Sequence, residues 1–248
     1  MTKLMTTVAA SLLATGVAHA DPAKTIVLVH GAFADGSSWD KITPLLQAKG
    51  YNVVAVYEPL AGLDSDVAAT KRVLDAQPGP ILLVGHSYGG VVITEAGNHD
   101  KVIGLVYVAA FAPDAGESVN DLGKGQPAPP WAKDLVVDSA GFASLPVADV
   151  LKDFAQDLPA GEAKLLASKQ GPISTKSFDD KPKAAAWHKK PSWWVRTEQD
   201  HMIDPNAQAA MAKRIGAKVT NVAGSHVSML SKPNEVAAVI LAAASGKK

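Results

Sequence analysis

Residues 81–96 constrain the fold of this chain more than any other segment, because they read as a strand, a tight turn and a helix in direct succession. The aliphatic run Ile81 to Val84 leads into Gly85-His86-Ser87-Tyr88-Gly89-Gly90, and a helical stretch follows. Glycines on both sides of Ser87 let the backbone turn where a side chain would collide. A serine hydroxyl becomes an effective nucleophile when such a turn exposes it to a base and to backbone N–H groups. We therefore predict that Ser87 is a catalytic nucleophile rather than part of an ordinary glycine-rich turn.

Short β-branched runs alternate with helical stretches along most of the chain, a pattern typical of a parallel sheet wrapped by helices. The predicted strands are 25–29, 52–57, 81–84, 102–108, 192–197 and 218–222. The clearest predicted helices are 39–49, 64–76 and 206–215. A chain of 248 residues with 47% hydrophobic content suits one domain with a full core. The expected fold is a doubly wound α/β domain, spanning 21–248, with a mostly parallel six-stranded sheet.

The alternation stops between residues 114 and 190, a proline-rich stretch with short helical pieces such as 147–157 and 161–169 and no convincing strand. This stretch is too long for a plain connection and too apolar for a disordered linker. Ligands in open α/β sheets bind beyond the carboxyl ends of the strands. We therefore predict an inserted, mainly helical lid at that edge. Its apolar residues suggest a hydrophobic substrate, although they can equally form the lid's own core.

A serine nucleophile needs a base to accept its proton and an acid to orient that base. His226 follows the last predicted strand, where a loop at the carboxyl edge of the sheet can carry an imidazole to Ser87. Asp200 lies in the turn after strand 192–197, while Asp204 precedes a proline and reads as a helix cap. We predict a triad of Ser87, Asp200 and His226. Asp114, just past strand 102–108, is the alternative acid.

Negative charge that develops on a substrate oxygen requires fixed donors, which are usually backbone N–H groups. The amide of Tyr88 is one expected donor, because it follows the nucleophile at the start of a helix. The turn His30-Gly31-Ala32-Phe33 follows the first strand, and the amide of Ala32 is the expected second donor. This turn lacks the glycine spacing and the lysine of a phosphate-binding loop.

The charge balance and the N-terminus indicate where the protein works and what it binds. The chain has 24 basic and 24 acidic residues, which argues against nucleic-acid or anionic-membrane partners and fits a small, roughly neutral substrate. It has no cysteine, and the predicted chemistry needs no metal and no organic cofactor. Residues 1–20 read as a secretory signal cleaved after Ala20, rather than as a packed helix or an anchor. The mature protein is expected to be periplasmic or secreted, without stable membrane association.

Four segments together resemble a known family: His30-Gly31-Ala32-Phe33 with Trp39, the turn around Ser87, Thr197-Glu198-Gln199-Asp200, and Ser225-His226-Val227-Ser228-Met229-Leu230. They are similar to the plant methylesterase and hydroxynitrile lyase branch of the α/β-hydrolases and to its small bacterial esterase relatives. The resemblance implies the α/β-hydrolase fold. It also implies the same triad, and oxyanion donors at Ala32 and Tyr88.

The lyases of this branch resemble one another in a threonine beside the nucleophile and a lysine directly after the catalytic histidine. The matching positions here are Gly31 and Val227, which cannot stabilise a leaving cyanide. The sequence therefore favours a serine esterase that cleaves small-molecule carboxylic esters through an acyl-enzyme. A carbon–carbon lyase on the same scaffold and a non-catalytic ligand-binding homologue are the alternatives. Epoxide hydrolases and dehalogenases are disfavoured, since they place an aspartate at the position of Ser87.

Overall fold

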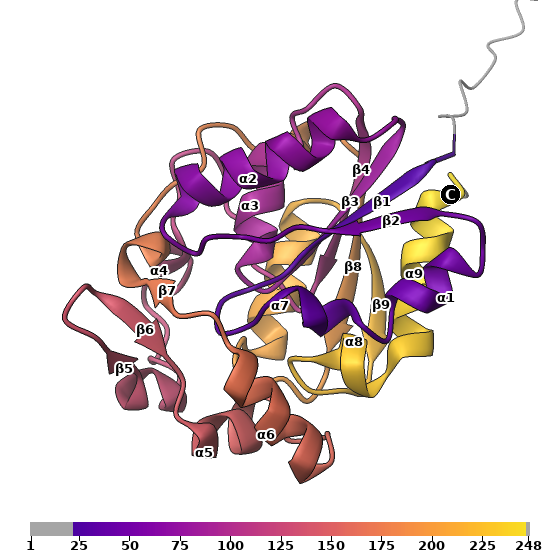
Figure 1. Cartoon of the computed structure of the whole chain (residues 1–248). Helices are drawn as coiled ribbons and strands as arrows, with labels where there is room; N and C mark the ends of the chain where they lie inside the picture. Colours follow the sequence, from indigo (N-terminus) through magenta and orange to yellow (C-terminus); the bar gives the residue numbers. More distant parts are fainter. Residues whose placement is uncertain (1–21, 247–248) are drawn as a thin grey trace, which may run out of the picture.

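The computed structural model describes residues 22–246, so the predicted signal segment 1–20 lies outside the described residues. A six-stranded sheet forms the centre of the molecule (Figure 1). Its strands are β1 (Thr25–Val29), β2 (Asn52–Ala55), β3 (Ile81–His86), β4 (Val102–Val108), β8 (Ser192–Thr197) and β9 (Lys218–Val222). All neighbouring pairs are parallel, in the order β2-β1-β3-β4-β8-β9. The predicted parallel α/β sheet is confirmed.

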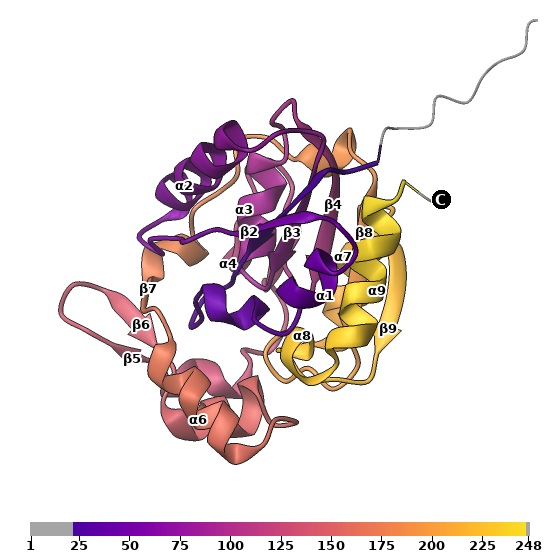
Figure 2. The ribbon, with the colours of Figure 1, turned by 45° about the vertical axis from the view of Figure 1, so that its right-hand side comes forward.

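Helices cover both faces of this sheet, as expected for a doubly wound fold. They are α1 (Thr43–Gln47), α2 (Leu63–Ala76), α3 (Gly89–Ala96), α7 (Pro205–Arg214), α8 (Ser228–Ser231) and α9 (Pro233–Ala244). Helices α2 and α3 pack together on one side of the sheet, and α1 and α9 pack together on the other (Figure 2). The inner strands β1 and β3 are buried along their whole length, because layers lie on both of their faces.

The predicted helix over 39–49 is wrong in its extent. The structure has a 3₁₀ turn at Gly36–Trp39 and then the short helix α1, with Pro44 in its first turn. Proline has no N–H to donate and is tolerated only at a helix start, so a new helix begins there. The apolar residues Trp39, Ile42 and Leu46 of this stretch are nevertheless fully buried, and Leu45 is partly buried.

Most of the segment between β4 and β8 lies at one end of the molecule, at the left and lower left of Figure 1. It contains α4 (Val119–Leu122), α5 (Val147–Asp149), a π-helix (Val150–Phe154) and α6 (Ala160–Lys169), with 3₁₀ turns at Pro130–Asp134, Thr175–Phe178 and Ala186–His188. It also contains a small antiparallel sheet of β5 (Val136–Val137), β6 (Phe142–Ser144) and β7 (Ile173–Ser174). The expectation that this lid holds no strand is therefore wrong. Strands of two or three residues are too short to show a period of two.

Candidate active site

Ser87 occupies the turn between β3 and α3 in a left-handed backbone conformation, with a φ of 54°. A non-glycine residue in this region is strained, and such strain persists where the surrounding structure imposes it. Here the glycines impose it: a Cβ at Gly85 would lie 2.6 Å from the Gly89 carbonyl oxygen, and one at Gly90 would lie 2.2 Å from the Phe111 carbonyl oxygen. The sharp turn predicted from the motif is present, and Ser87 is 7% exposed.

His226 lies in the loop after β9 and is paired with Asp200, which lies in the turn after β8. The Nδ1 of His226 is 2.9 Å from Oδ2 and 3.1 Å from Oδ1 of Asp200. The imidazole is 1% exposed, and the carboxylate is buried. Nδ1–H donates to this carboxylate, which leaves Nε2 of His226 unprotonated and able to accept a proton.

The buried carboxylate of Asp200 is fully hydrogen-bonded. Its Oδ1 accepts the backbone N–H groups of Met202 (2.8 Å) and Ile203 (3.0 Å). Its Oδ2 accepts the Thr197 hydroxyl and the Gln208 side-chain amide, both at 2.8 Å. A buried charge is tolerated when its lone pairs are satisfied in this way. The roles of Thr197 and Gln208 were not predicted. Thr197 lies in one of the recognised segments, but nothing in the local sequence indicates that its hydroxyl or the Gln208 amide bonds Asp200.

Asp114, the alternative acid, lies elsewhere. Its Oδ1 is 2.9 Å from Nε2 of His188, and the two side chains are 42% and 53% exposed. This is a surface pair. Asp204 caps α7 as predicted, since its carboxylate accepts the N–H of Asn206.

His86, inside the serine turn, fixes the backbone of the His226 loop. Its Nε2 is 2.9 Å from the carbonyl oxygen of His226, and the two rings lie 4.7 Å apart. A carbonyl oxygen only accepts, so Nε2 of His86 carries the proton. Complete burial lowers the pKa of His86 well below its usual value. The ring therefore stays neutral and does not oppose a positive charge on His226.

No hydrogen bond joins the Ser87 hydroxyl to Nε2 of His226 within residues 22–246, although the loop of His226 lies directly on the serine turn. Catalytic hydrogen bonds of this type are often long without substrate and shorten when it binds. Proton transfer between the two side chains would require the hydroxyl and the imidazole to approach each other.

The backbone amides of Ala32 and Tyr88 are both free in the described part of the chain, since neither donates a hydrogen bond. Tyr88 precedes the first residue of α3, so its N–H lies at the positive end of that helix. The turn of Ala32 packs on the nucleophile, since a Cβ at Gly31 would lie 2.7 Å from Cβ of Ser87. Free backbone amides are the kind of donor that an oxyanion needs, so the expectation for Ala32 and Tyr88 stays a prediction.

The lid covers this group of residues. Trp131 packs edge-on against Phe33 of the β1 turn, with ring centroids 6.3 Å apart, and its Nε1 donates to the carbonyl of Met202. Phe154, which is 1% exposed, packs on the ring of His226 with a centroid distance of 5.2 Å. The prediction that the lid lies at the carboxyl ends of the strands agrees with these contacts. Its aromatic residues line the roof of the site.

Two buried carboxyl groups lie beneath the serine turn. Asp66 accepts the hydroxyl of Tyr88 (3.0 Å) and the N–H of Leu60 (2.8 Å). Glu58 accepts the Thr70 hydroxyl. Burial raises the pKa of Asp66 to about 6 and raises the pKa of Glu58 well above its usual range. The hydrogen bond to Asp66 holds the ring of Tyr88, the residue that follows the nucleophile.

The raised pKa of Asp66 predicts a component of stability that falls as pH rises. The folded protein binds this proton more tightly than the unfolded chain, so the contribution is complete below about pH 4 and is lost as pH rises through about 6. The shift corresponds to a difference of up to about 3 kcal/mol. We expect Asp66→Asn to become more stable relative to the wild type as pH rises from 4 to 7, measured by urea unfolding. The exposed Asp64→Asn, in the same turn of α2, is the control, and parallel curves for wild type and Asp66→Asn would contradict the prediction.

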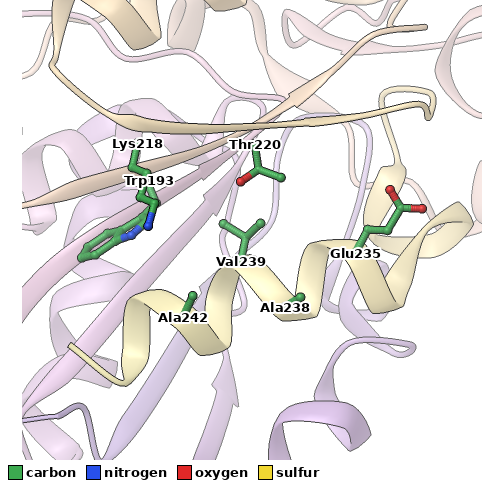
Figure 3. Close-up of a pocket in the computed structure, with 7 residues that line it drawn as sticks. All are labelled: Trp193, Lys218, Thr220, Glu235, Ala238, Val239 and Ala242. Atoms are coloured by element: carbon green, nitrogen blue, oxygen red, sulfur yellow. The ribbon is translucent and has the colours of Figure 1, made fainter. Parts of the chain in front are cut away.

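A groove elsewhere in the described chain offers no second serine–histidine pair. A groove of about 360 Å³ lies between α9 and the start of β8 and β9, where Trp193, Thr220 and Val239 face one another (Figure 3). Its lining contains no serine and no histidine. Within residues 22–246, no group of three or more histidine, aspartate or glutamate side chains is arranged to hold a metal ion. No helix in this range is both long enough and apolar enough to cross a membrane.

The fold and the turns after β1, β3, β8 and β9 define an α/β protein with a serine at a strand-to-helix turn and an aspartate–histidine pair in neighbouring loops. The model of the α/β-hydrolase family matches residues 26–239, so the chain belongs to that family.

The relatives fall in the branch that the motifs predicted. A pyrethroid hydrolase of Sphingobium wenxiniae is 33% identical over 98 residues, which are 34% of this chain and 35% of that protein. Salicylic acid-binding protein 2 of Nicotiana tabacum is 36% identical over 107 residues, 37% of this chain and 41% of that protein. A methylesterase and the α-hydroxynitrile lyase of Arabidopsis thaliana also match. The aligned segments thus span only about two fifths or less of the length of these relatives.

The solved structures extend the likeness of fold to most of the chain. The crystal structure of a pyrethroid hydrolase from Sphingobium faniae superposes with a TM-score of 0.77 at 24% identity, covering 89% of this chain and 97% of that one. At this identity the superposition establishes the shared fold and not a shared substrate.

Proposed function

We propose that this protein is a carboxylic ester hydrolase. The observation that carries the proposal is the buried Asp200–His226 pair beside the strained Ser87. His226 removes the hydroxyl proton while Ser87 Oγ attacks the ester carbonyl, and the amides of Ala32 and Tyr88 hold the resulting oxyanion. His226 then protonates the leaving alcohol. Water, deprotonated in turn by His226, hydrolyses the acyl-serine and releases the acid.

The apolar roof of the site favours neutral, apolar esters. Trp131 packs on Phe33, in the turn that carries Ala32, and Phe154 packs on the imidazole of His226, so the lid presents aromatic rings to the proposed catalytic residues. Several relatives are named for ester hydrolysis, among them a methylesterase of Arabidopsis thaliana and polyneuridine aldehyde esterase.

Cyanohydrin cleavage is the second candidate, because a hydroxynitrile lyase is among the relatives. Two residues disfavour it. A side chain at position 31 would collide with Ser87 and with the carbonyl oxygen of His86, 2.9 Å from the added Cβ, so a threonine there requires a backbone shift. Val227 is buried and apolar where a lysine would be needed.

A substrate screen on the mature protein tests the proposal. We expect turnover of p-nitrophenyl esters, highest for short apolar acyl chains, and no release of cyanide from mandelonitrile. Cyanide release without ester turnover would replace the proposal with the lyase. Failure of a fluorophosphonate probe to label Ser87, together with no turnover of any ester or lactone, would indicate a binding protein without catalysis.

A further inference from the structure

One short piece of the lid touches both loops that carry the acid and the base. We call residues 153–157 the clamp segment. It begins at the end of the π-helix Val150–Phe154, where the N–H of Ala155 donates to the carbonyl of Val150, five residues earlier. Single π-helical turns occur frequently at functional sites, because they rotate the following side chains relative to an α-helix. Here the rotation directs successive residues toward the loops of Asp200 and His226.

Asp157 binds the residue that precedes His226. Its Oδ2 accepts the N–H of Ser225 at 2.8 Å. Ser225 is fully buried, and its hydroxyl accepts the N–H of Val227 at 3.3 Å. The backbone is therefore tied on both sides of His226. With the bond from His86 to the carbonyl of His226, this leaves the loop little freedom to rotate the imidazole.

Gln156 binds the residue that precedes Asp200. Its side-chain Nε2 donates to the carbonyl of Gln199 at 2.6 Å. Asp153 lies on the other side of the same turn, with Oδ1 3.3 Å from Nδ1 of His201. The clamp segment thus contacts the residues on both sides of Asp200 without contacting the carboxylate itself.

Phe154, also in the clamp segment, contacts the base directly, because its ring packs on the imidazole of His226 with an interplanar angle of 60°. These contacts join parts of the chain that are 43 to 72 residues apart in sequence, so each one closes a long loop. We infer that Asp157 and Gln156 are positioning residues, through which the lid holds the base and acid loops in the geometry that proton transfer requires. The inference rests on the proposed function, since it assigns these residues a role in the reaction of Ser87.

Such positioning matters because proton transfer tolerates only small displacements of the side chains that exchange the proton. A catalytic side chain must be held within about 0.5 Å of its productive position, and a displacement of about 1 Å can cost about a hundredfold in rate. Substrate binding depends on the apolar roof and is less sensitive to the imidazole position. A loss of positioning therefore lowers kcat and leaves KM nearly unchanged.

The test compares Asp157→Ala, Asp157→Asn and Gln156→Ala with p-nitrophenyl butyrate as substrate. We expect Asp157→Ala to lower kcat by about tenfold to a hundredfold, with KM within about threefold of the wild type. Asp157→Asn should restore most of kcat, because an amide oxygen still accepts the N–H of Ser225. Gln156→Ala should lower kcat without raising KM.

Glu162→Ala is the matched control, because Glu162 on α6 joins the lid to Lys41 of the main domain without touching either catalytic loop. A wild-type kcat for Asp157→Ala, or an equal loss for Glu162→Ala, would overturn the inference. If Asp157→Ala does not fold, Gln156→Ala decides: a lowered kcat supports the inference and a wild-type kcat overturns it. Ser87→Ala separates the two proposals. Ester turnover that survives Ser87→Ala would overturn the proposed function itself, whereas lost turnover with an unaffected Asp157→Ala would overturn only the role of the clamp segment.

Discussion

Replacing Ser87 with alanine is expected to lower kcat for a short p-nitrophenyl ester by about five to six orders of magnitude, the loss typical of a removed triad nucleophile. The remaining rate would reflect substrate binding and the amides of Ala32 and Tyr88. The fold should persist, because the geometry of the turn comes from Gly85, Gly89 and Gly90 and not from the hydroxyl. Alanine at a φ of 54° is strained in the same way as serine.

The measurement is steady-state kinetics on purified variants, with circular dichroism and thermal unfolding to check the fold. Ser168→Ala is a suitable control, since the hydroxyl of Ser168 bonds only the carbonyl of Leu165 on the exposed face of the lid helix α6. It should retain wild-type activity. A folded Ser87→Ala variant with more than about a hundredth of wild-type kcat would rule out Ser87 as the nucleophile.

The central sheet was predictable because each of its strands is a short segment rich in β-branched, aliphatic or aromatic residues and bounded by turns. The strands β1, β4, β8 and β9 begin and end where the pattern predicts. The same strand pattern indicated Ser87, His226 and Asp200 as candidates. Each of them follows a predicted parallel strand, and the carboxyl ends of parallel strands meet at one edge of the sheet. The turns after β3, β8 and β9 lie at that edge, and Asp200 lies against His226 there.

The lid was less predictable for physical reasons. The strands β5 and β7 have two residues each, and their pairing partners are set by tertiary contacts. The bond from Asp157 to Ser225 spans 68 residues and leaves no local trace in the sequence. His86 is different, because it lies within the recognised motif. A histidine at a fully buried strand end is a signal that it bonds a neighbouring loop.

Replacing Asp200 with asparagine is expected to lower kcat by about four orders of magnitude, by changing the tautomer of His226. The two backbone N–H groups of Met202 and Ile203 fix the side-chain oxygen at the position of Oδ1. The new NH₂ group then occupies the position of Oδ2, 2.9 Å from Nδ1 of His226. A donor there forces Nδ1 to give up its proton, so Nε2 becomes protonated and cannot accept the proton of Ser87.

Asp114→Asn is the control for this change, because it alters the other candidate acid. Asp114 pairs with His188 at the surface and makes no hydrogen bond with His226 in the described part of the chain. We expect it to retain wild-type kcat. The two variants are compared by kcat/KM between pH 6 and 10, where the Asp200→Asn profile should be low throughout. The amide preserves the shape and the backbone contacts of the carboxylate, but its NH₂ group cannot accept the bonds that Thr197 and Gln208 donate to Oδ2. Thermal unfolding of Asp200→Asn is therefore measured beside kcat, to separate the change of tautomer from local repacking. Equal activity of Asp200→Asn and the wild type would show that the buried pair does not serve proton transfer.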